Sequence, residues 1–162
     1  MKSLKKAARN MWQSVIATSK GKVLVDTCVI LHYLLGDSLA DNAESLVKHA
    51  VEDKLTLYMS SEAYDDAITA FRSKGICMST ILDILEKWAS IPHQVLPVTI
   101  EIAMEALKLY NVHGGTRKLH YFDAFHVATA KHFNLPLVTS DRYVLDHSEE
   151  LGLKVIDLRE IQ

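Results

Sequence analysis

The sequence has 162 residues, of which 49% are apolar and 23% charged, and its formal net charge is −2. This length and composition fit one globular domain with a full hydrophobic core. The near-neutral charge does not by itself indicate a nucleic-acid-binding protein, and no apolar run approaches the roughly 18 residues that a membrane-spanning helix needs.

The charge is unevenly distributed, because residues 1–22 carry +6 and the remainder carries −8. Within the basic part, residues 3–17 alternate apolar and polar side chains with helical spacing. We therefore predict a basic amphipathic helix in an N-terminal extension, residues 1–21, ending near Gly21, followed by one domain over residues 22–162. We expect this helix to dock on the domain or on a dimer mate. The alternatives are that its basic face contacts RNA phosphates or a membrane surface.

The domain opens with a short apolar strand over residues 23–25, which is followed by Asp26 and a helix over residues 27–35 that Gly36 closes. Strands and helices then alternate along the chain. Further strands are expected over residues 55–59, 94–98, 135–139 and 154–156, and further helices over residues 40–51, 60–75, 79–91, 99–112, 120–133 and 142–150. This alternation predicts a three-layer α/β/α fold with a mostly parallel sheet of four to five strands.

Four acidic residues occupy related places in this pattern. Asp26 and Asp141 end strands, Glu62 begins the helix after a strand, and Asp123 lies early in the most apolar helix. Parallel strands end at the same edge of a sheet, so these side chains are expected to meet there. Two carboxylates about 4 Å apart repel by roughly 4 kcal/mol at an effective dielectric of 20, so the cluster is expected either to take up protons or to bind a cation. Mg²⁺ or Mn²⁺ fits such oxygen ligands. The cluster therefore predicts metal-assisted hydrolysis of a phosphate ester.

Each acidic residue also has a structural interpretation. Asp26 would cap a helix, Glu62 would complement a helix dipole, and Asp141 would serve in a turn. Asp65 or Asp66, one turn after Glu62, would be a substitute for it in the cluster. Two other side chains offer different chemistry: His126, one turn after Asp123, as a base, and Cys28 as a nucleophile. A satisfied core histidine is the commoner role for the first, and no histidine stands at a recognisable spacing from the second.

Four segments that contain the acidic residues also carry a recognisable pattern of neighbours. They are Val25-Asp26-Thr27 after a buried strand, Ser61-Glu62 after the second strand, Tyr121-Phe122-Asp123-Ala124 followed by Ala128-Thr129-Ala130, and Val138-Thr139-Ser140-Asp141. In order and spacing, over about residues 22–157, these resemble the four acidic motifs of the PIN-domain nucleases. The resemblance is closest to the small prokaryotic single-domain members, including VapC-type toxins.

The resemblance implies a metal-dependent endoribonuclease that hydrolyses single-stranded RNA with Mg²⁺ or Mn²⁺. It assigns metal binding and catalysis to Asp26, Glu62, Asp123 and Asp141, with Thr27 and Ser140 as polar neighbours that orient a ligand or water. It also implies a homodimer and, for the toxin members, inhibition by an antitoxin protein. The basic residues that flank the acidic motifs are expected either to hold the phosphate backbone or to be ordinary solvated charges: Arg117, Lys118, His120 and Arg142.

Other functions remain open from the sequence. An RNA-processing PIN nuclease outside any toxin system, or a PIN-like module that binds without cutting, would have similar motifs. Phosphoryl transfer through an aspartyl phosphate is disfavoured, since Thr27 and Cys28 follow Asp26 where those proteins have a second acid. Cys28 and Cys77 have no metal-ligand spacing and are expected to be reduced and buried. With no apolar core of a signal peptide, the sequence favours a soluble protein of the cytoplasm.

Overall fold

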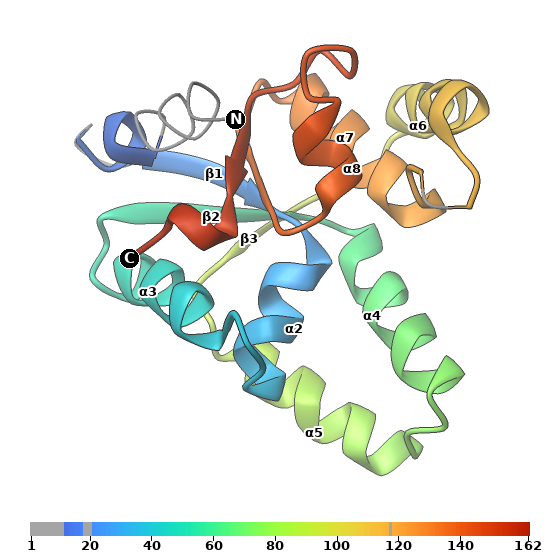
Figure 1. The fold of residues 1–162 in the computed structure, drawn as a ribbon. Coiled ribbons are helices and arrows are strands. Elements are labelled where there is room, and N and C mark those ends of the chain that lie inside the picture. Colours follow the sequence, from blue (N-terminus) through green and yellow to red (C-terminus); the bar gives the residue numbers. More distant parts are fainter. Residues whose placement is uncertain (1–11, 18–20, 117) are drawn as a thin grey trace.

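The computed structural model describes residues 12–17, 21–116 and 118–162, and its centre is one sheet of five parallel strands (Figure 1). The strand order is β3-β2-β1-β4-β5, and each neighbouring pair is parallel. The strands are β1 Gly21–Val25, β2 Leu55–Ser60, β3 Gln94–Leu96, β4 Leu137–Thr139 and β5 Val155–Asp157. The predicted three-layer α/β fold with a parallel sheet is confirmed.

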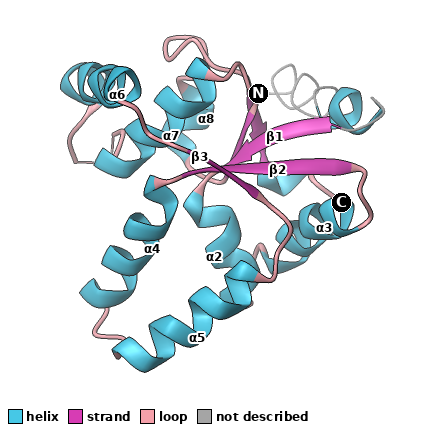
Figure 2. Cartoon of the chain, turned by 180° about the vertical axis from the view of Figure 1, so that it is seen from behind, coloured by secondary structure: helices cyan, strands magenta, loops and turns pink. Residues whose placement is uncertain are grey.

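Helices cover both faces of the sheet, as Figures 1 and 2 show. The elements on one face are α2 Thr27–Leu35, α3 Ala40–Val51, α4 Glu62–Ser73, α5 Met78–Ala89 and the 3-10 turn η1 Leu158–Glu160. The elements on the other face are α6 Ile100–His113, α7 Tyr121–His132 and α8 Arg142–Asp146. Within the part of the chain that the structure describes, no helix is both long enough and apolar enough to cross a membrane.

Burial on both faces explains the uninterrupted apolar run of β1. Val23 and Val25 belong to the core cluster under α2–α5, whereas Leu24 points to the cluster under α6 and α7. In a strand whose two faces are both covered, successive residues are all apolar and do not alternate with polar ones. The same holds for α7, where every side chain over residues 124–130 is buried, so the predicted buried helix is confirmed.

The observed bounds of helices and strands agree best with the predicted ones where capping residues or proline fix the ends. Helix α2 begins and ends at the predicted residues, because the Asp26 side chain accepts a hydrogen bond from Cys28 N and Gly36 closes the helix at φ 66°. Strand β3 lies at the sheet edge, as predicted, and stops before Pro97, which cannot donate to a ladder. Helix α8 ends at Asp146, earlier than expected, because the chain continues as turns.

Two predictions about cysteines need correction. Cys77 is exposed rather than buried, since it lies at the N-terminal cap position of α5 in the connection from α4. Cys28 is partly exposed as a residue, although it packs against the core. Both thiols are free, which agrees with the expected reduced state.

The described part of the N-terminal extension, residues 12–17, is helical and packs on the domain. Trp12 is 4% exposed, and its ring meets the His49 ring edge-on with 5.4 Å between centroids. Val15 and Ile16 pack against the same core cluster. The other residues of the predicted helix lie outside the described part of the chain.

We predict that Trp12→Ala lowers the free energy of unfolding by about 3 kcal/mol, because it removes a large buried ring from the core. Chemical denaturation of the full chain measures this loss. The matched control is Gln13→Ala, which changes an exposed neighbour in the same helical segment. Equal effects of the two substitutions would show that the Trp12 ring does not stabilise the domain.

Candidate metal centre

Asp26 lies at the carboxyl end of β1 and is 3% exposed. Its N–H donates to the carbonyl of Val138 on β4 across 3.0 Å, which continues the pairing of the two strands. One carboxylate oxygen, Oδ1, accepts from Cys28 N at 3.3 Å and caps α2, and the other, Oδ2, accepts from the Thr139 hydroxyl at 2.5 Å. Asp26 therefore serves as a helix cap, and its charge lies at the sheet edge where a ligand site was expected.

Thr139, the last residue of β4, connects Asp26 to a second acidic residue. Its Oγ1 accepts from Asp141 N at 3.0 Å while it donates to Asp26. The Asp141 carboxylate caps α8 by accepting from Val144 N at 2.9 Å. Sequence reasoning did not assign a role to Thr139, although its place inside the last acidic motif, two residues before Asp141, was the available signal.

Helix α7 passes beneath this edge and contributes Asp123 and His126. One group of potential metal ligands combines Asp26 and His126 with Asp66 of α4, and its ligand atoms lie within 4.8 Å of one another. His126 Nε2 lies 3.5 Å from Asp66 Oδ2, 4.0 Å from Asp26 Oδ1 and 2.9 Å from the hydroxyl oxygen of Thr27. Thr27 is buried and is engaged with this ring.

A second group brings Asp123 and Asp141 together with His120, again within 4.8 Å. His120 precedes α7 and is exposed, whereas Asp123 is largely buried. Asp123 Oδ2 lies 3.2 Å from His120 Nδ1 without the geometry of a hydrogen bond, so this buried oxygen has no hydrogen-bond partner within the described residues.

Of the four acidic residues predicted to meet, Asp26, Asp123 and Asp141 belong to these groups, and Glu62 belongs to neither. Glu62 is the first residue of α4, and its N–H donates to the Ser60 hydroxyl at 3.3 Å. One helical turn later, Asp66 contributes the carboxylate that reaches His126. Residues four apart lie on the same helix face, so Glu62 and Asp66, one of the substitutes that the sequence offered, share a face of α4.

The pKa values of two side chains reflect this crowding. Burial and the nearby charge of Asp26 raise the pKa of Asp123 to about 7, with a further contribution from Asp141. Burial alone would lower the pKa of His126, but its hydrogen bond to Asp66 and the charges of Asp26 and Asp123 together raise it. Asp123 therefore keeps its proton up to about pH 7, and the neighbouring carboxylates hold the proton of His126 more tightly than water would.

Ser140 and Cys28 lie on the α2 side of the acidic residues. The Ser140 hydroxyl is 3.0 Å from His32 Nε2 and donates to Cys28 Sγ at 3.2 Å, and His32 Nδ1 lies 2.6 Å from Asp37. Burial, followed by the charge of Asp26, raises the pKa of the Cys28 thiol well above its ordinary value. A thiol held protonated is a poor nucleophile, which removes the case for Cys28 as a catalytic nucleophile.

Two of the basic residues predicted to hold RNA, Lys118 and Arg142, have exposed side chains. Arg142 is the first residue of α8 and follows Asp141 directly. Arg117 lies outside the described residues.

The donor set fits a divalent metal ion. Asp26 and Asp66 group with the His126 imidazole, and Asp123 and Asp141 group with that of His120. Asp123 also offers a buried oxygen that no hydrogen bond satisfies. Buried polar atoms are normally hydrogen-bonded, so a buried carboxylate oxygen that lacks a hydrogen bond and lies among other carboxylates favours a cation as an additional partner.

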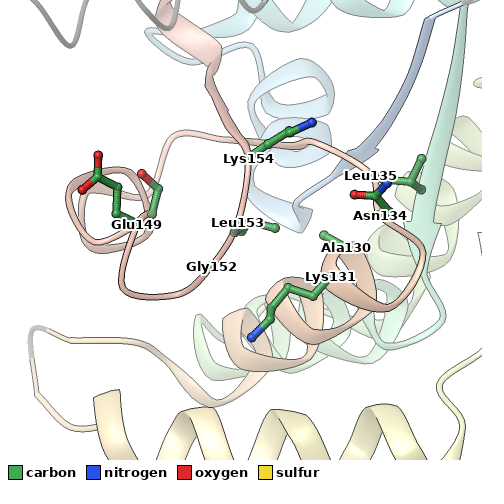
Figure 3. A pocket seen from close by; sticks show the side chains of 9 residues that line it. Ala130, Lys131, Asn134, Leu135, Glu149, Gly152, Leu153 and Lys154 are labelled. Carbon is green, nitrogen blue, oxygen red and sulfur yellow. The ribbon is translucent and has the colours of Figure 1, made fainter.

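A separate cavity of about 510 Å³ lies at the opposite ends of β4 and β5 (Figure 3). It is lined by Ala130, Lys131, Asn134, Leu135, Ser148, Glu149, Gly152, Leu153 and Lys154. Lys131 is paired with Glu105 at 3.0 Å, and Figure 3 shows the Lys131 and Lys154 side chains pointing in different directions. The cavity thus lacks convergent charges, and the acidic edge is the better candidate site.

The parallel α/β sheet and the carboxylates at the carboxyl ends of its strands place this chain among α/β proteins with an acidic ligand site at one edge of the sheet. Residues 23–150 match the family model of the PIN domain. The chain therefore belongs to the PIN-domain family, whose members are nucleases. No match was found among curated proteins.

Solved structures with the same fold include chains of three complexes. VapBC2 from Rickettsia felis, bound to a DNA fragment from their promoter, has a TM-score of 0.60 at 15% identity, covering 84% of this chain and 98% of the other. FitAcB from Neisseria gonorrhoeae has a TM-score of 0.58 at 17% identity, covering 85% and 98%. VapBC-1 from nontypeable Haemophilus influenzae has a TM-score of 0.57 at 18% identity, covering 85% and 98%. At such identities the likeness establishes the fold.

The raised pKa of Asp123 predicts that the metal-free protein loses stability as pH rises. A carboxyl whose pKa is higher in the folded than in the unfolded state stabilises the fold fully below its ordinary pKa, and this contribution disappears as pH passes about 7. The raised pKa of His126 acts in the same direction. Melting temperatures measured in EDTA should therefore fall by a few degrees between about pH 5 and pH 8.

Asp123→Asn should flatten this profile, because it removes the carboxyl that titrates. Asp65→Asn, which changes an exposed acidic residue of α4, is the control and should keep the slope. A wild-type profile that rises with pH would contradict the assignment.

Proposed function

We propose that the protein is a metal-dependent endoribonuclease that hydrolyses phosphodiester bonds of single-stranded RNA with Mg²⁺ or Mn²⁺. The observation that carries this proposal is a pair of adjacent ligand groups in a PIN-family chain, Asp26 and Asp66 with His126 and Asp123 and Asp141 with His120, linked by the interaction of the Asp26 and Asp123 charges. In this proposal Asp66, rather than Glu62, supplies the acidic group of α4. The second half of the proposal is that the protein acts as the toxin of a toxin-antitoxin pair.

The side chains divide the work at this edge. Asp26 and Asp66 face His126, and Asp123 and Asp141 face His120, so two neighbouring sets of ligands are available. A bound Mg²⁺ or Mn²⁺ would make a water more acidic and neutralise charge that develops on the phosphate. The Thr139 hydroxyl holds the Asp26 carboxylate in one orientation, which favours a preorganised site.

Exposed basic side chains support an RNA substrate. Lys118 and Arg142 carry positive charge in a chain whose domain is otherwise acidic, and Arg142 directly follows Asp141. We propose that these two residues and Arg117 hold the phosphate backbone on either side of the scissile bond. Thr27 and Ser140 act less directly, because Thr27 contacts His126 and Ser140 contacts His32 and Cys28.

The partners we propose are an antitoxin protein and a second copy of this chain. The structures with a similar fold include VapBC and FitAB assemblies and a toxin-antitoxin complex from Klebsiella pneumoniae. Helix α6 exposes large apolar side chains one turn apart, Ile100, Met104 and Leu107. Exposed apolar side chains that cluster on one helix favour a protein partner.

RNA cleavage with separate acidic variants tests the metal mechanism. We predict that EDTA, Asp26→Asn and Asp66→Asn each reduce cleavage of a fluorogenic single-stranded RNA by about 100-fold or more, because each removes the cation or one of its ligands. Glu62→Gln is the matched control on the same helix and should reduce the rate only slightly. Cleavage that survives EDTA would defeat the mechanism.

The comparison of Asp66→Asn with Glu62→Gln also decides which acidic residue of α4 belongs to the site. If Glu62→Gln abolishes cleavage and Asp66→Asn does not, the acidic site residue of α4 is Glu62, as predicted from the sequence. Circular dichroism of each variant establishes that the fold is intact.

Two related functions would share the same site geometry: an RNA-processing PIN nuclease and a PIN-like module that binds without cutting. We predict that expression of the wild-type chain arrests bacterial growth, because a toxin cleaves cellular RNA without its antitoxin. Asp26→Asn, produced at the same level, should permit growth. Normal growth of cells that contain active wild-type nuclease would favour the RNA-processing function, and binding of RNA without cleavage would favour the module.

A further inference from the structure

Each of the two ligand groups contains one histidine, His126 in the first and His120 in the second. His126 is fully buried, whereas His120 is exposed. The His126 ring is 0% exposed, and Nε2 faces Thr27, Asp66 and Asp26 at 2.9, 3.5 and 4.0 Å. Nδ1, on the other side of the ring, has no hydrogen-bond partner among the described residues. A histidine that only filled the core would not need to direct a nitrogen at two carboxylates.

The spacing of these atoms suits shared coordination. Ligand atoms that each lie about 2.1 Å from one metal ion are separated by about 3 to 4.2 Å from one another. Both separations from His126 Nε2 to the carboxylate oxygens fall within that interval. The Thr27 hydroxyl oxygen lies closer to Nε2, and its hydrogen can rotate away so that the oxygen lone pairs face the same ion.

We infer that His126 is a nitrogen ligand of the metal ion held by Asp26 and Asp66, and that it makes this site prefer transition-metal ions such as Mn²⁺ to Mg²⁺. The inference rests on the metal dependence in the proposed function and adds a ligand and a selectivity to it. Carboxylates and water suit Mg²⁺, whereas imidazole is a ligand that first-row transition metals accept more readily.

If His126 were a charged counter-ion and not a ligand, its replacement would change the metal affinity in the opposite direction. If its ring were a protonated counter-ion for the carboxylates, it would repel any divalent cation. Replacing it with a neutral side chain would then strengthen the binding of Mn²⁺ and Mg²⁺ alike. A ligand role predicts instead that the same replacement weakens Mn²⁺ binding most.

Metal binding to the full-length protein separates these roles without any activity measurement. The loss of the free Mn²⁺ signal in electron paramagnetic resonance gives the Mn²⁺ affinity, and competition gives that of Mg²⁺. His126→Gln substitutes an amide for the ring and leaves oxygen donors only. We expect the preference for Mn²⁺ over Mg²⁺ to fall by about tenfold or more.

The matched control is His132→Gln, which changes an exposed histidine in the last turn of the same helix and should leave both affinities unchanged. An equal fall in both affinities, a rise in both, or no change in His126→Gln overturns the inference.

A second measurement does not depend on the folding of His126→Gln. In the Mn²⁺-loaded His120→Gln protein, the histidine of the other ligand group is gone, so a nitrogen hyperfine signal in pulsed electron paramagnetic resonance reports His126. Its presence supports the inference. Bound Mn²⁺ without this signal overturns the inference and leaves the proposed nuclease function standing, whereas a chain that cleaves no RNA with any divalent ion fails the proposed function itself.

Discussion

The structure depends on the cost of placing several carboxylates beside an apolar core. Asp26 is almost fully buried, and Asp123 lies close enough for the two charges to interact. Protons relieve the repulsion in the metal-free protein, which is why the pKa of Asp123 rises to about 7. The fold accepts this cost because the strand ends, the helix caps and the hydroxyl of Thr139 hold the charges in place.

Much of the fold was predictable because local and long-range signals agree. Helix α2 has an acidic cap at one end and Gly36 at the other, and α7 is buried over residues 124–130 because it lies between the sheet and helix α6. The parallel sheet followed from the alternation of strands and helices. Asp26 and Asp141 could be placed at one edge because the last residues of parallel strands converge there whatever the loops do.

The features that the sequence did not reveal depend on how helices dock and on contacts between residues far apart in the chain. Glu62 and Asp66 lie one turn apart on α4, and only the docking of that helix decides which carboxylate reaches His126. The role of Thr139 depends on its position opposite Asp26, which no local pattern reveals. The exposure of Cys77 likewise follows from the packing of α4 against α5, since a thiol between two helices is buried or exposed according to their connection.

The single hydroxyl of Thr139 has a mechanical consequence. Its oxygen receives the N–H of Asp141, where α8 begins, and its hydrogen goes to Asp26, where α2 begins. A ligand that tilts α8 therefore strains the bond that orients Asp26. The two strand-to-helix junctions should move as one rigid unit, so a ligand that displaces one junction also displaces the other through one shared oxygen atom.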